Sequence, residues 1–435
     1  MESEKLWLKL RSSFWFLPAI YGLIAIGLVF AVHHLDSWLI HQHKVQLPQV
    51  LLTSSDVAKE LYSALVTAIL TMTTISISVI MAVLTTYSSQ FSPRTLQDFM
   101  RSSSTHHVLG FYSFGFIFAL LHLILVDKNS LVIGPIIMGL IAIMILGFFI
   151  YFIHYSARWV QVNHLIAKIR MDGSRVIQNT YKPREYLEYS NWNEEEVNKI
   201  KRKCTAMIHA KNPGYIQTID FKNLVAWSRQ HNASLILNVQ VGDYVLEDYP
   251  LLHITVSEDQ KHTKELHEYV IIDSERTDIL DIEFSLQKLV DIALRAISPA
   301  INDPHTAINC INRIGELLHE TGKNYRETYY FADKEKQLRV IHHPKKFEDY
   351  LYKSFYQIRH YGKDDISVIY GIMEVLYKLS VVSNKTIKQK LWEFHYYITD
   401  VIEWDFLSEL DRQHMQWICD AFKACHREED SLSLS

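Results

Sequence analysis

The sequence lacks the short signatures that identify the common enzyme classes. It contains no glycine-rich nucleotide-binding loop, no HExxH, no GxSxG and no protein-kinase signature. Cysteine is scarce, with four residues and no CxxC pair, which argues against disulfides and against a structural zinc site. We therefore expect a protein that is not an enzyme, that uses no cofactor and no metal ion, and whose cysteines are free thiols: Cys204, Cys310, Cys419 and Cys425.

Acidic and basic side chains are missing from four long stretches near the N-terminus, and from none of comparable length after residue 153. Each stretch is long enough to cross the hydrocarbon layer of a bilayer, about 30 Å thick, as a helix. The net charge of −4 averages this apolar part with a charged remainder and indicates no nucleic-acid partner. The sequence predicts a transmembrane domain over residues 1–157, in contact with the lipid bilayer, with spans at 14–32, 61–84, 108–126 and 131–153.

Lys and Arg are unevenly distributed over the segments that connect these spans, and this distribution sets the orientation of a membrane protein. The positive-inside rule places both the N-terminus and the large C-terminal part in the cytoplasm. The first span has no small-residue cleavage site after it, so we expect it to stay in the mature protein. The side predicted to be cytoplasmic carries Lys5, Lys9, Arg11, Arg94, Arg101, Arg158, Lys168 and Arg170, whereas the other carries Lys44, Lys59 and Lys128.

The second span is free of charge but rich in Ser and Thr. At about 100° per residue, five of these residues fall within about 80° of one helical face. If the helix extends one turn outward, Asp56 and Glu60 project onto the same face. Lipid chains offer hydroxyl groups no hydrogen-bond partners, so this face should contact another helix or water. The five residues, called the hydroxyl face from here on, are Ser63, Thr67, Thr71, Thr74 and Ser78.

Two interpretations of the hydroxyl face stay open. In a symmetric homo-oligomer it would line a pore for monovalent cations, with Asp56 and Glu60 as the outer vestibule. Small hydroxyl residues at four-residue spacing also let membrane helices pack closely, and they can bond back to the preceding turn. The pore hypothesis requires an oligomer, because the four helices of one protomer are too few to enclose a hydrated channel.

Other polar residues in or near the spans suggest regulation. His122, within the third span, is a candidate protonation gate, although a neutral His hydrogen-bonded between helices is the alternative. Ser92, Pro93 and Arg94 end the second span, because proline disfavours helix at the residue before it. They form a candidate coupling elbow, and a bare loop that holds the helices together is the alternative. External histidines could sense pH, bind a transition metal or simply be solvated on an interfacial helix: His33, His34, His41 and His43.

The cytoplasmic part divides by periodicity. Residues 158–205 are charged and helical, and alternation of apolar and polar residues then predicts a small β domain over 206–260. Its Gly242-Asp243 turn and the following residues are similar to the half-motif of biotinyl and lipoyl-type barrel-sandwich domains, but no Lys occupies the turn, which excludes a covalent carrier. The expected strands are 214–220, 234–241 and 251–256, followed by a helical domain over 261–426, helical without a break from about residue 279, and a disordered tail over 427–435.

The helical domain contains a concentration of polar residues. We expect one helix over 281–297 and a second that begins at Pro304 with Asp303 as its N-cap. Around these helices lies a candidate ligand site for a divalent cation or a phosphorylated compound. A structural explanation is also open, since Asp291 and Arg295 are spaced as an i, i+4 helix pair. The candidate ligand site consists of Arg276, Asp291, Arg295, Asn302, Asp303 and His305.

Several unusual runs of residues resemble an uncharacterised family of bacterial membrane proteins, domain of unknown function 2254. The resemblance covers nearly the whole chain and implies a membrane topology and an inner-membrane location, but no activity. The runs that carry it are Gln90-Phe91-Ser92-Pro93-Arg94, Ser298-Pro299-Ala300-Ile301-Asn302-Asp303-Pro304 with Thr306-Ala307, Gly214-Tyr215-Ile216-Gln217 and Glu275-Arg276-Thr277.

These patterns together predict a membrane protein with four transmembrane α-helices and a cytoplasmic α+β region. The function they favour is a homo-oligomeric, cation-permeable channel lined by the second transmembrane helix and gated through the cytoplasmic domain. The alternative is a non-conducting membrane-anchored sensor or scaffold whose cytoplasmic domain binds a small ligand or a protein. A third hypothesis, an enzyme acting on a lipid, would require the external histidines to be catalytic.

Overall fold

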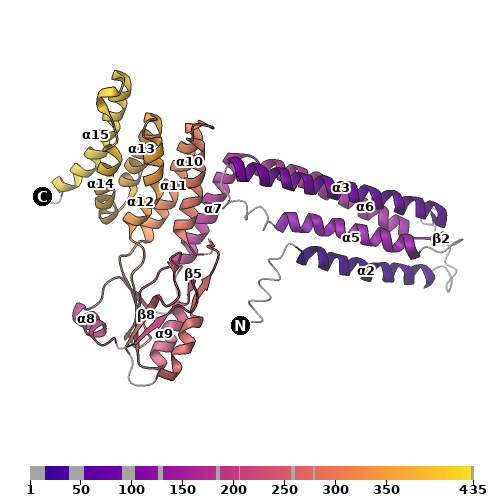
Figure 1. The fold of residues 1–435 in the computed structure, drawn as a ribbon, viewed down its shortest axis with the longest axis horizontal. Helices are drawn as coiled ribbons and strands as arrows, with labels where there is room; N and C mark the ends of the chain where they lie inside the picture. Colours follow the sequence, from indigo (N-terminus) through magenta and orange to yellow (C-terminus); the bar gives the residue numbers. More distant parts are fainter. Residues whose placement is uncertain are drawn as a thin grey trace. The chain divides into compact units, whose positions relative to one another are not determined.

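The structure is a computed structural model that describes residues 15–38, 53–90, 103–125, 131–182, 187–204, 206–255, 260–277 and 280–432. The chain forms two compact units that meet in sequence between Leu165 and Ile166. Figure 1 traces the elements of both units. The first unit holds the helices that can cross a membrane, and the second combines helices with sheets.

Four helices of the first unit are long and apolar enough to cross a bilayer, which confirms the four predicted spans. Helix α5 contacts the other three, and α3 also contacts α6. Large side chains such as Tyr112, Phe118 and Met138 are fully buried between them. The interior of the bundle is therefore filled with side chains. The helices are α2 (Phe16–Ser37), α3 (Ser55–Gln90), α5 (Ser103–Leu125) and α6 (Gly134–Trp159).

The helices differ in extent from the predicted spans. Helix α3 has 36 residues, so at 1.5 Å per residue it is about 54 Å long and extends beyond the hydrocarbon layer. The fourth span does not begin at residue 131: β2 (Leu131–Val132) pairs antiparallel with β1 (Thr53–Ser54). Helix α6 starts at Gly134, with a proline in its first turn, where a missing N–H costs nothing.

The described residues of the second unit form two sheets. The larger has six strands in the order β3-β10-β11-β6-β8-β4, all antiparallel except the parallel pair β11 and β6, and the smaller has the order β7-β5-β9. Apolar residues of both sheets and of helix α9 form one core. The strands are β3 (Leu187–Tyr189), β4 (Ala206–His209), β5 (Gly214–Ile219), β6 (Ser234–Leu237), β7 (Tyr244–Val245), β8 (Pro250–Thr255), β9 (Val270–Asp273), β10 (Tyr329–Ala332) and β11 (Leu338–His342).

The helices of this unit gather on one side of the sheets, apart from α8 and α9 (Figure 1). Helix α7 packs closely against α10 and α11 at Gly173. A Cβ atom added at Gly173 would lie only 3.0 Å from Leu317 of α11 and 3.2 Å from Ser285 of α10. The helices are α7 (Val162–Thr180), α8 (Glu194–Arg202), α9 (Phe221–Gln230), η3 (Gln260–Glu268), α10 (Ile282–Ala296), α11 (Pro304–Asn324), α12 (Phe347–Gly362), α13 (Ile366–Val382), α14 (Lys385–Thr399), η4 (Trp404–Phe406) and α15 (Glu409–Leu432).

The three strands expected between residues 214 and 256 are confirmed as β5, β6 and β8. The expectation of unbroken helix from about residue 279 onward is wrong, because β10 and β11 occur there and join the large sheet. Strands from outside 206–260 thus complete both sheets, so the β region is not a self-contained barrel-sandwich unit. The backbone also stays helical to Leu432, beyond the predicted start of a disordered tail at residue 427.

Candidate functional site

The hydroxyl face of α3 points away from the other helices of its own protomer. All five of its residues are exposed, whereas Tyr62, Ile69 and Ile80 on the opposite side of α3 are buried. Large aliphatic side chains flank the face, with Leu70 49% exposed and Ile75 43% exposed. The face is therefore an outer surface of the bundle, available to lipid or to another copy of the chain.

Each hydroxyl on this face for which the structure gives a bond donates to the carbonyl oxygen four residues earlier. The distances are 3.1 Å for Thr67, 2.9 Å for Thr71, and 3.0 Å for both Thr74 and Ser78. These internal bonds satisfy the hydroxyl hydrogens without a partner helix. The lone pairs of the oxygens stay on the surface, where they can accept hydrogen bonds from water or coordinate a cation weakly.

Asp56 and Glu60 lie in the first turns of α3, since the helix begins at Ser55 as the sequence hypothesis required. Both side chains are exposed. Their spacing places them on the same arc as the hydroxyl face, toward its N-terminal end. One continuous stripe of α3 thus carries two carboxylates followed by the five hydroxyl residues.

His122 does not lie on that stripe. It is 4% exposed, inside the bundle, with its ring centroid 5.5 Å from that of Tyr62 and 4.2 Å from that of Phe118. Its Nδ1 lies 3.0 Å from the carbonyl oxygen of Phe118, and Nε2 has no hydrogen-bond partner within the described residues. His122 therefore contacts the buried side of α3, and its protonation would not act directly on a path along the hydroxyl face.

Some predicted residues near the membrane lie outside the described residues. These are the coupling elbow Ser92, Pro93 and Arg94 and the histidines His41 and His43. His33 and His34 are described and exposed, near the C-terminal end of α2.

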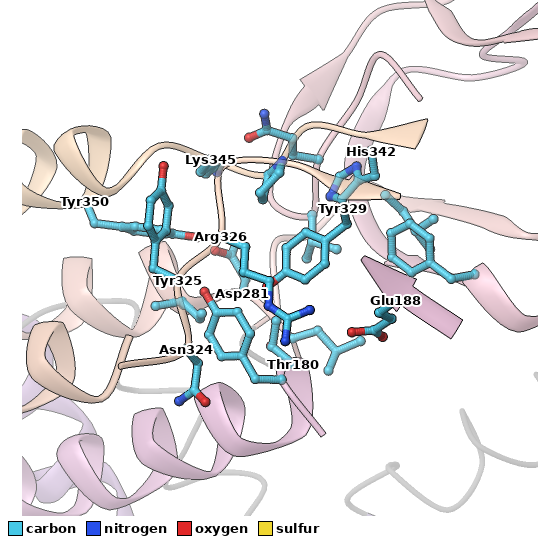
Figure 2. A pocket seen from close by; sticks show the side chains of 18 of the residues that line it. Thr180, Glu188, Asp281, Asn324, Tyr325, Arg326, Tyr329, His342, Lys345 and Tyr350 are labelled. Atoms are coloured by element: carbon cyan, nitrogen blue, oxygen red, sulfur yellow. The ribbon is translucent and has the colours of Figure 1, made fainter. Parts of the chain in front are cut away.

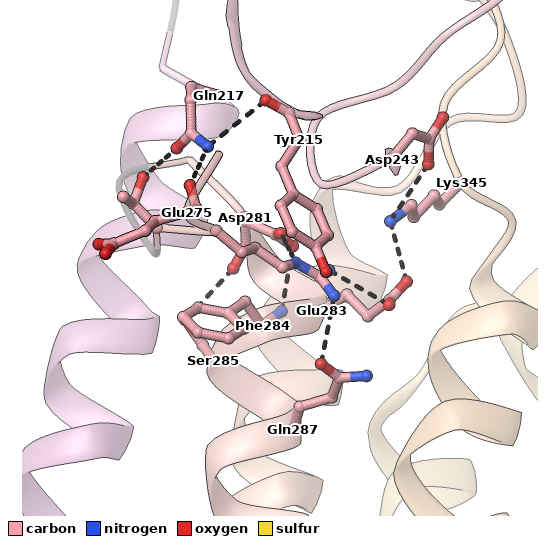
Figure 3. A network of polar contacts seen from close by, with 12 residues as sticks. Tyr215, Gln217, Asp243, Glu275, Asp281, Glu283, Phe284, Ser285, Gln287 and Lys345 are labelled. Atoms are coloured by element: carbon pink, nitrogen blue, oxygen red, sulfur yellow. Dashed lines mark hydrogen bonds and ion pairs between the residues drawn. The ribbon is translucent and has the colours of Figure 1, made fainter. Parts of the chain in front are cut away.

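In the second unit, Arg276 forms the centre of a buried polar network, which Figure 3 draws. Its guanidinium donates to Asp281 at 2.6 Å, to Glu283 at 3.2 Å and to Gln287 at 3.2 Å. The side chains of Arg276, Asp281 and Glu283 are only 14%, 3% and 8% exposed. Asp281 also caps α10 by accepting the N–H of Phe284 at 3.0 Å.

Lys345 extends this network from the segment before α12. Its Nζ lies 2.9 Å from Glu283 and 3.7 Å from Asp243. Figure 3 draws both contacts as dashed lines. Burial alone raises the pKa of Glu283, but Lys345 and Arg276 outweigh burial and hold that pKa below its ordinary value. Burial raises the pKa of Asp243, and Lys345 opposes the rise only in part. With Lys353, whose Nζ lies 3.9 Å from Glu283, the network therefore holds three cationic groups against three carboxylates.

The six residues of the predicted cytoplasmic ligand site do not converge. Arg276 contacts the N-terminal end of α10, whereas the N–H of Asp303 donates to Ala296 at the C-terminal end. These ends are about 22 Å apart, because α10 has 15 residues at 1.5 Å each. Asp303 is the predicted N-cap of α11, accepting the N–H of Thr306 at 3.1 Å and its hydroxyl at 2.6 Å. The contacts therefore do not bring all six residues together at one place.

The other predicted residues lie around that C-terminal end. Asp291 and Arg295 are one turn apart on α10, half-buried and exposed respectively, and His305 is exposed in the first turn of α11. Asn302 adopts a left-handed φ of 50°, which suits the tight turn between the two helices. Within the described residues, no group of three or more His, Cys, Asp or Glu side chains is placed to hold a metal ion.

A cavity of about 250 Å³ lies elsewhere in the second unit, and no sequence motif indicated it (Figure 2). It is enclosed by the end of α7, the strands β3, β10 and β11, and the segments that precede α10 and α12. Its lining residues come from positions between 180 and 350, so no local spacing could have revealed them. The one sequence signal was the aromatic density of Tyr325 and Tyr329-Tyr330-Phe331. Burial raises the pKa values of Tyr181 and Tyr350, so both phenols in its wall stay uncharged.

The chain is similar to proteins of mycobacteria. An uncharacterized protein of Mycobacterium tuberculosis (strain CDC 1551 / Oshkosh) is 25% identical over 317 residues, which are 66% of this chain and 57% of the relative. An uncharacterized protein of Mycobacterium bovis matches with the same identity and coverage. The chain thus spans little more than half the length of these relatives. No solved structure matches it.

A family model described as "Predicted membrane protein (DUF2254)" matches residues 11–378, a range that includes all four apolar helices and both sheets. This chain belongs to that family of predicted membrane proteins.

Proposed function

We propose that copies of this protein associate in the membrane through the hydroxyl face of α3 and that the associated faces enclose a path for monovalent cations. The observation that carries the proposal is the exposure of all five hydroxyl residues on an isolated protomer. An uncharged helix face that neither packs against its own bundle nor gains from contact with lipid is best explained by contact with other copies or with water.

The packing of the bundle supports a path between copies rather than through one copy. Phe118, Met138 and Ile145 are at most 1% exposed and occupy the interior between the helices. A hydrated path needs a lining of polar groups, and the polar lining of α3 is on the outside. Rotational symmetry would bring the same face of each copy toward a common axis.

The two carboxylates supply a charge preference. In a symmetric assembly, Asp56 and Glu60 of every copy form acidic rings at one end of the hydroxyl-lined path. Such rings raise the local concentration of cations and exclude anions. The hydroxyl oxygens further along the path would then coordinate a passing cation only weakly, so that it is not held tightly.

The remaining parts of the proposal concern setting and regulation. We place the protein in a bacterial inner membrane with both the N-terminus and the second unit in the cytoplasm, because Lys and Arg are concentrated on that side. Only Val160 and Gln161 separate α6 from α7, so a change in the second unit can reach the membrane helices through a short connection. The role is non-enzymatic: the cytoplasmic unit gates the path.

Cation flux tests the pore directly. Purified full-length protein in liposomes should pass potassium or sodium ions, measured with an ion-sensitive dye, and the double variant Thr71→Leu, Thr74→Leu should abolish the flux. Thr86→Leu is the matched control, because Thr86 is on the same helix and makes the same kind of internal bond, at 3.0 Å, but lies off the hydroxyl face. Equal flux in wild type and double variant, or none from folded wild-type protein, refutes the pore.

Self-association can be tested without flux. In membranes treated with a mild oxidant, Thr74→Cys should form covalent dimers, because symmetry brings Thr74 of neighbouring copies together. Ile143→Cys is the control, since Ile143 on α6 is 69% exposed but lies away from α3's hydroxyl face. Dimers in both variants, or in neither, contradict association through α3.

A second candidate function is a membrane-anchored sensor. The observation that favours it is the 250 Å³ cavity, which lies entirely within the second unit. A sensor needs no path across the membrane, so it predicts ligand binding without flux, and the unit from Ile166 onward should bind that ligand when expressed alone.

A further inference from the structure

Six of the twenty residues that line the cavity of the second unit are Tyr or Phe. Phe221 and Phe331 lie with ring centroids 4.7 Å apart, and Tyr329 stacks on Phe331 at 5.9 Å with an interplanar angle of 10°. Tyr325 and Tyr350 complete this set of rings around the space. Flat, polarisable walls of this kind favour a planar ring as the occupant, since offset stacking adds to the gain from apolar burial.

Cationic side chains line the same cavity. Lys323 and Arg326 are exposed at its rim, and within the described residues neither forms an ion pair with a carboxylate. The guanidinium of Arg326 lies 5.7 Å from the ring centroid of Tyr329, and Figure 2 shows the two side by side. An arginine held beside an aromatic ring can donate two hydrogen bonds to a carboxylate or phosphate while stacking on a planar group.

The carboxylates that face the cavity do not cancel this positive charge. Asp281 is already bound by Arg276 at 2.6 Å, and Lys345 is bound by Glu283 at 2.9 Å. Glu188, on β3, is the remaining acid in the lining, so one negative charge is set against the two positive charges of Lys323 and Arg326. The rim of the cavity is therefore net positive.

We propose that this cavity binds a mononucleotide, with its base between the aromatic walls and its phosphate at Arg326 and Lys323. The volume of about 250 Å³ lies just below the roughly 300–1,000 Å³ of typical small-molecule pockets, so the cavity admits one ligand whose base is enclosed while its phosphate lies at the exposed rim. A ring alone would leave the cations unused, and a free phosphate would leave the aromatic walls unused. A mononucleotide satisfies both.

This inference deepens the sensor candidate and is independent of conduction, since every lining residue belongs to the second unit. Binding is therefore measured on full-length protein in detergent, where no flux occurs. If binding fails and flux is present, the pore proposal stands alone; if flux fails and binding is present, the ligand site stands alone.

The probes are AMP, GMP, CMP and UMP, with adenosine as the ring without the anion and inorganic phosphate as the anion without the ring. Isothermal titration calorimetry should show saturable binding of at least one mononucleotide, and adenosine and phosphate should each bind at least tenfold more weakly. Absence of saturable binding for all four mononucleotides overturns the proposal. So does binding of adenosine or phosphate as tight as that of the best mononucleotide.

Variants locate the site. Arg326→Gln and Lys323→Gln change exposed side chains and should preserve folding, checked by thermal melting, while weakening the best mononucleotide at least tenfold. Arg175→Gln is the matched control, because Arg175 is an arginine of the same unit, 72% exposed and outside the cavity lining, and its loss should leave affinity unchanged. Wild-type affinity in both Arg326→Gln and Lys323→Gln would place binding elsewhere and overturn the assignment.

Discussion

Replacing Arg276 with Ala should destabilise the second unit strongly. The substitution removes hydrogen bonds to Asp281, Glu283 and Gln287 at once. Glu283 keeps Lys345 at 2.9 Å, but Asp281, 3% exposed, loses the cation that Arg276 supplies. Breaking a buried ion pair on one side costs about 3–5 kcal/mol, because the remaining charge is left desolvated. For a domain of this size, about 2–4 °C of melting temperature corresponds to each kcal/mol, so we expect a decrease of about 6–20 °C.

The assay is thermal melting of full-length protein in detergent, with hydrogen exchange of the α10 amides to assign the transition to the second unit. Arg229→Ala is the comparison, because Arg229 and Glu335 form an exposed pair at 3.3 Å with side chains 53% and 59% exposed. Exposed pairs contribute about 0–1 kcal/mol, so this variant should melt within about 4 °C of wild type. Equal shifts in the two variants would refute the conclusion that the Arg276 network is buried and paired.

Three further outcomes follow from single contacts. Gly134→Ala should lower stability by about 1–3 kcal/mol, because its Cβ would lie 2.6 Å from the Tyr62 hydroxyl; Gly147→Ala, with nothing within 4 Å, should be near neutral in the same detergent melt. Asp303→Ala should lower the free energy of unfolding by about 1 kcal/mol through loss of the α11 cap, whereas Asp303→Asn should keep most of that stability. Equal melting temperatures for the two variants would contradict the capping role of Asp303. Because the pKa of Glu283 is lower in the folded protein than its ordinary value of 4.5, the ionised carboxylate stabilises the fold at pH values above 4.5. This stability is lost as the pH falls through the folded-state pKa. Glu283→Gln should therefore make the melting temperature depend less on pH in this acidic range, measured in a pH series of melts.

The features that sequence revealed are those whose cause is local. A charge-free run of this length has to cross a membrane or be buried, and so the four spans could be predicted without tertiary information. The cap at Asp303 followed from an Asp before a Pro. The orientation of the hydroxyl face around α3 also followed from helical geometry alone, whereas its exposure depends on where the neighbouring helices pack.

The features that sequence missed depend on distant residues. Strand β11 is buried on both faces along most of its length, so it shows no alternation of polar and apolar residues, and its parallel partner β6 lies about a hundred residues earlier. The candidate ligand site failed for a related reason, because residues close in sequence were separated by the length of α10. The cavity depends on the packing of β3, β10 and β11 against helices, which no single segment specifies.

The hydroxyl face and the cavity have different requirements, and this difference decides how they can cooperate. The cavity is complete within one chain, so mononucleotide binding should be one per protomer and should not require assembly. The proposed path along the hydroxyl face needs a second copy. If the second unit gates the path, the two are coupled, and thermodynamic linkage makes the coupling reciprocal. A nucleotide that multiplies the open-to-closed equilibrium constant by some factor at saturation must bind the open state more tightly than the closed state by the same factor. A Thr71→Leu, Thr74→Leu variant that loses flux but binds nucleotide with wild-type affinity would then locate the loss in the path itself and not in the switch.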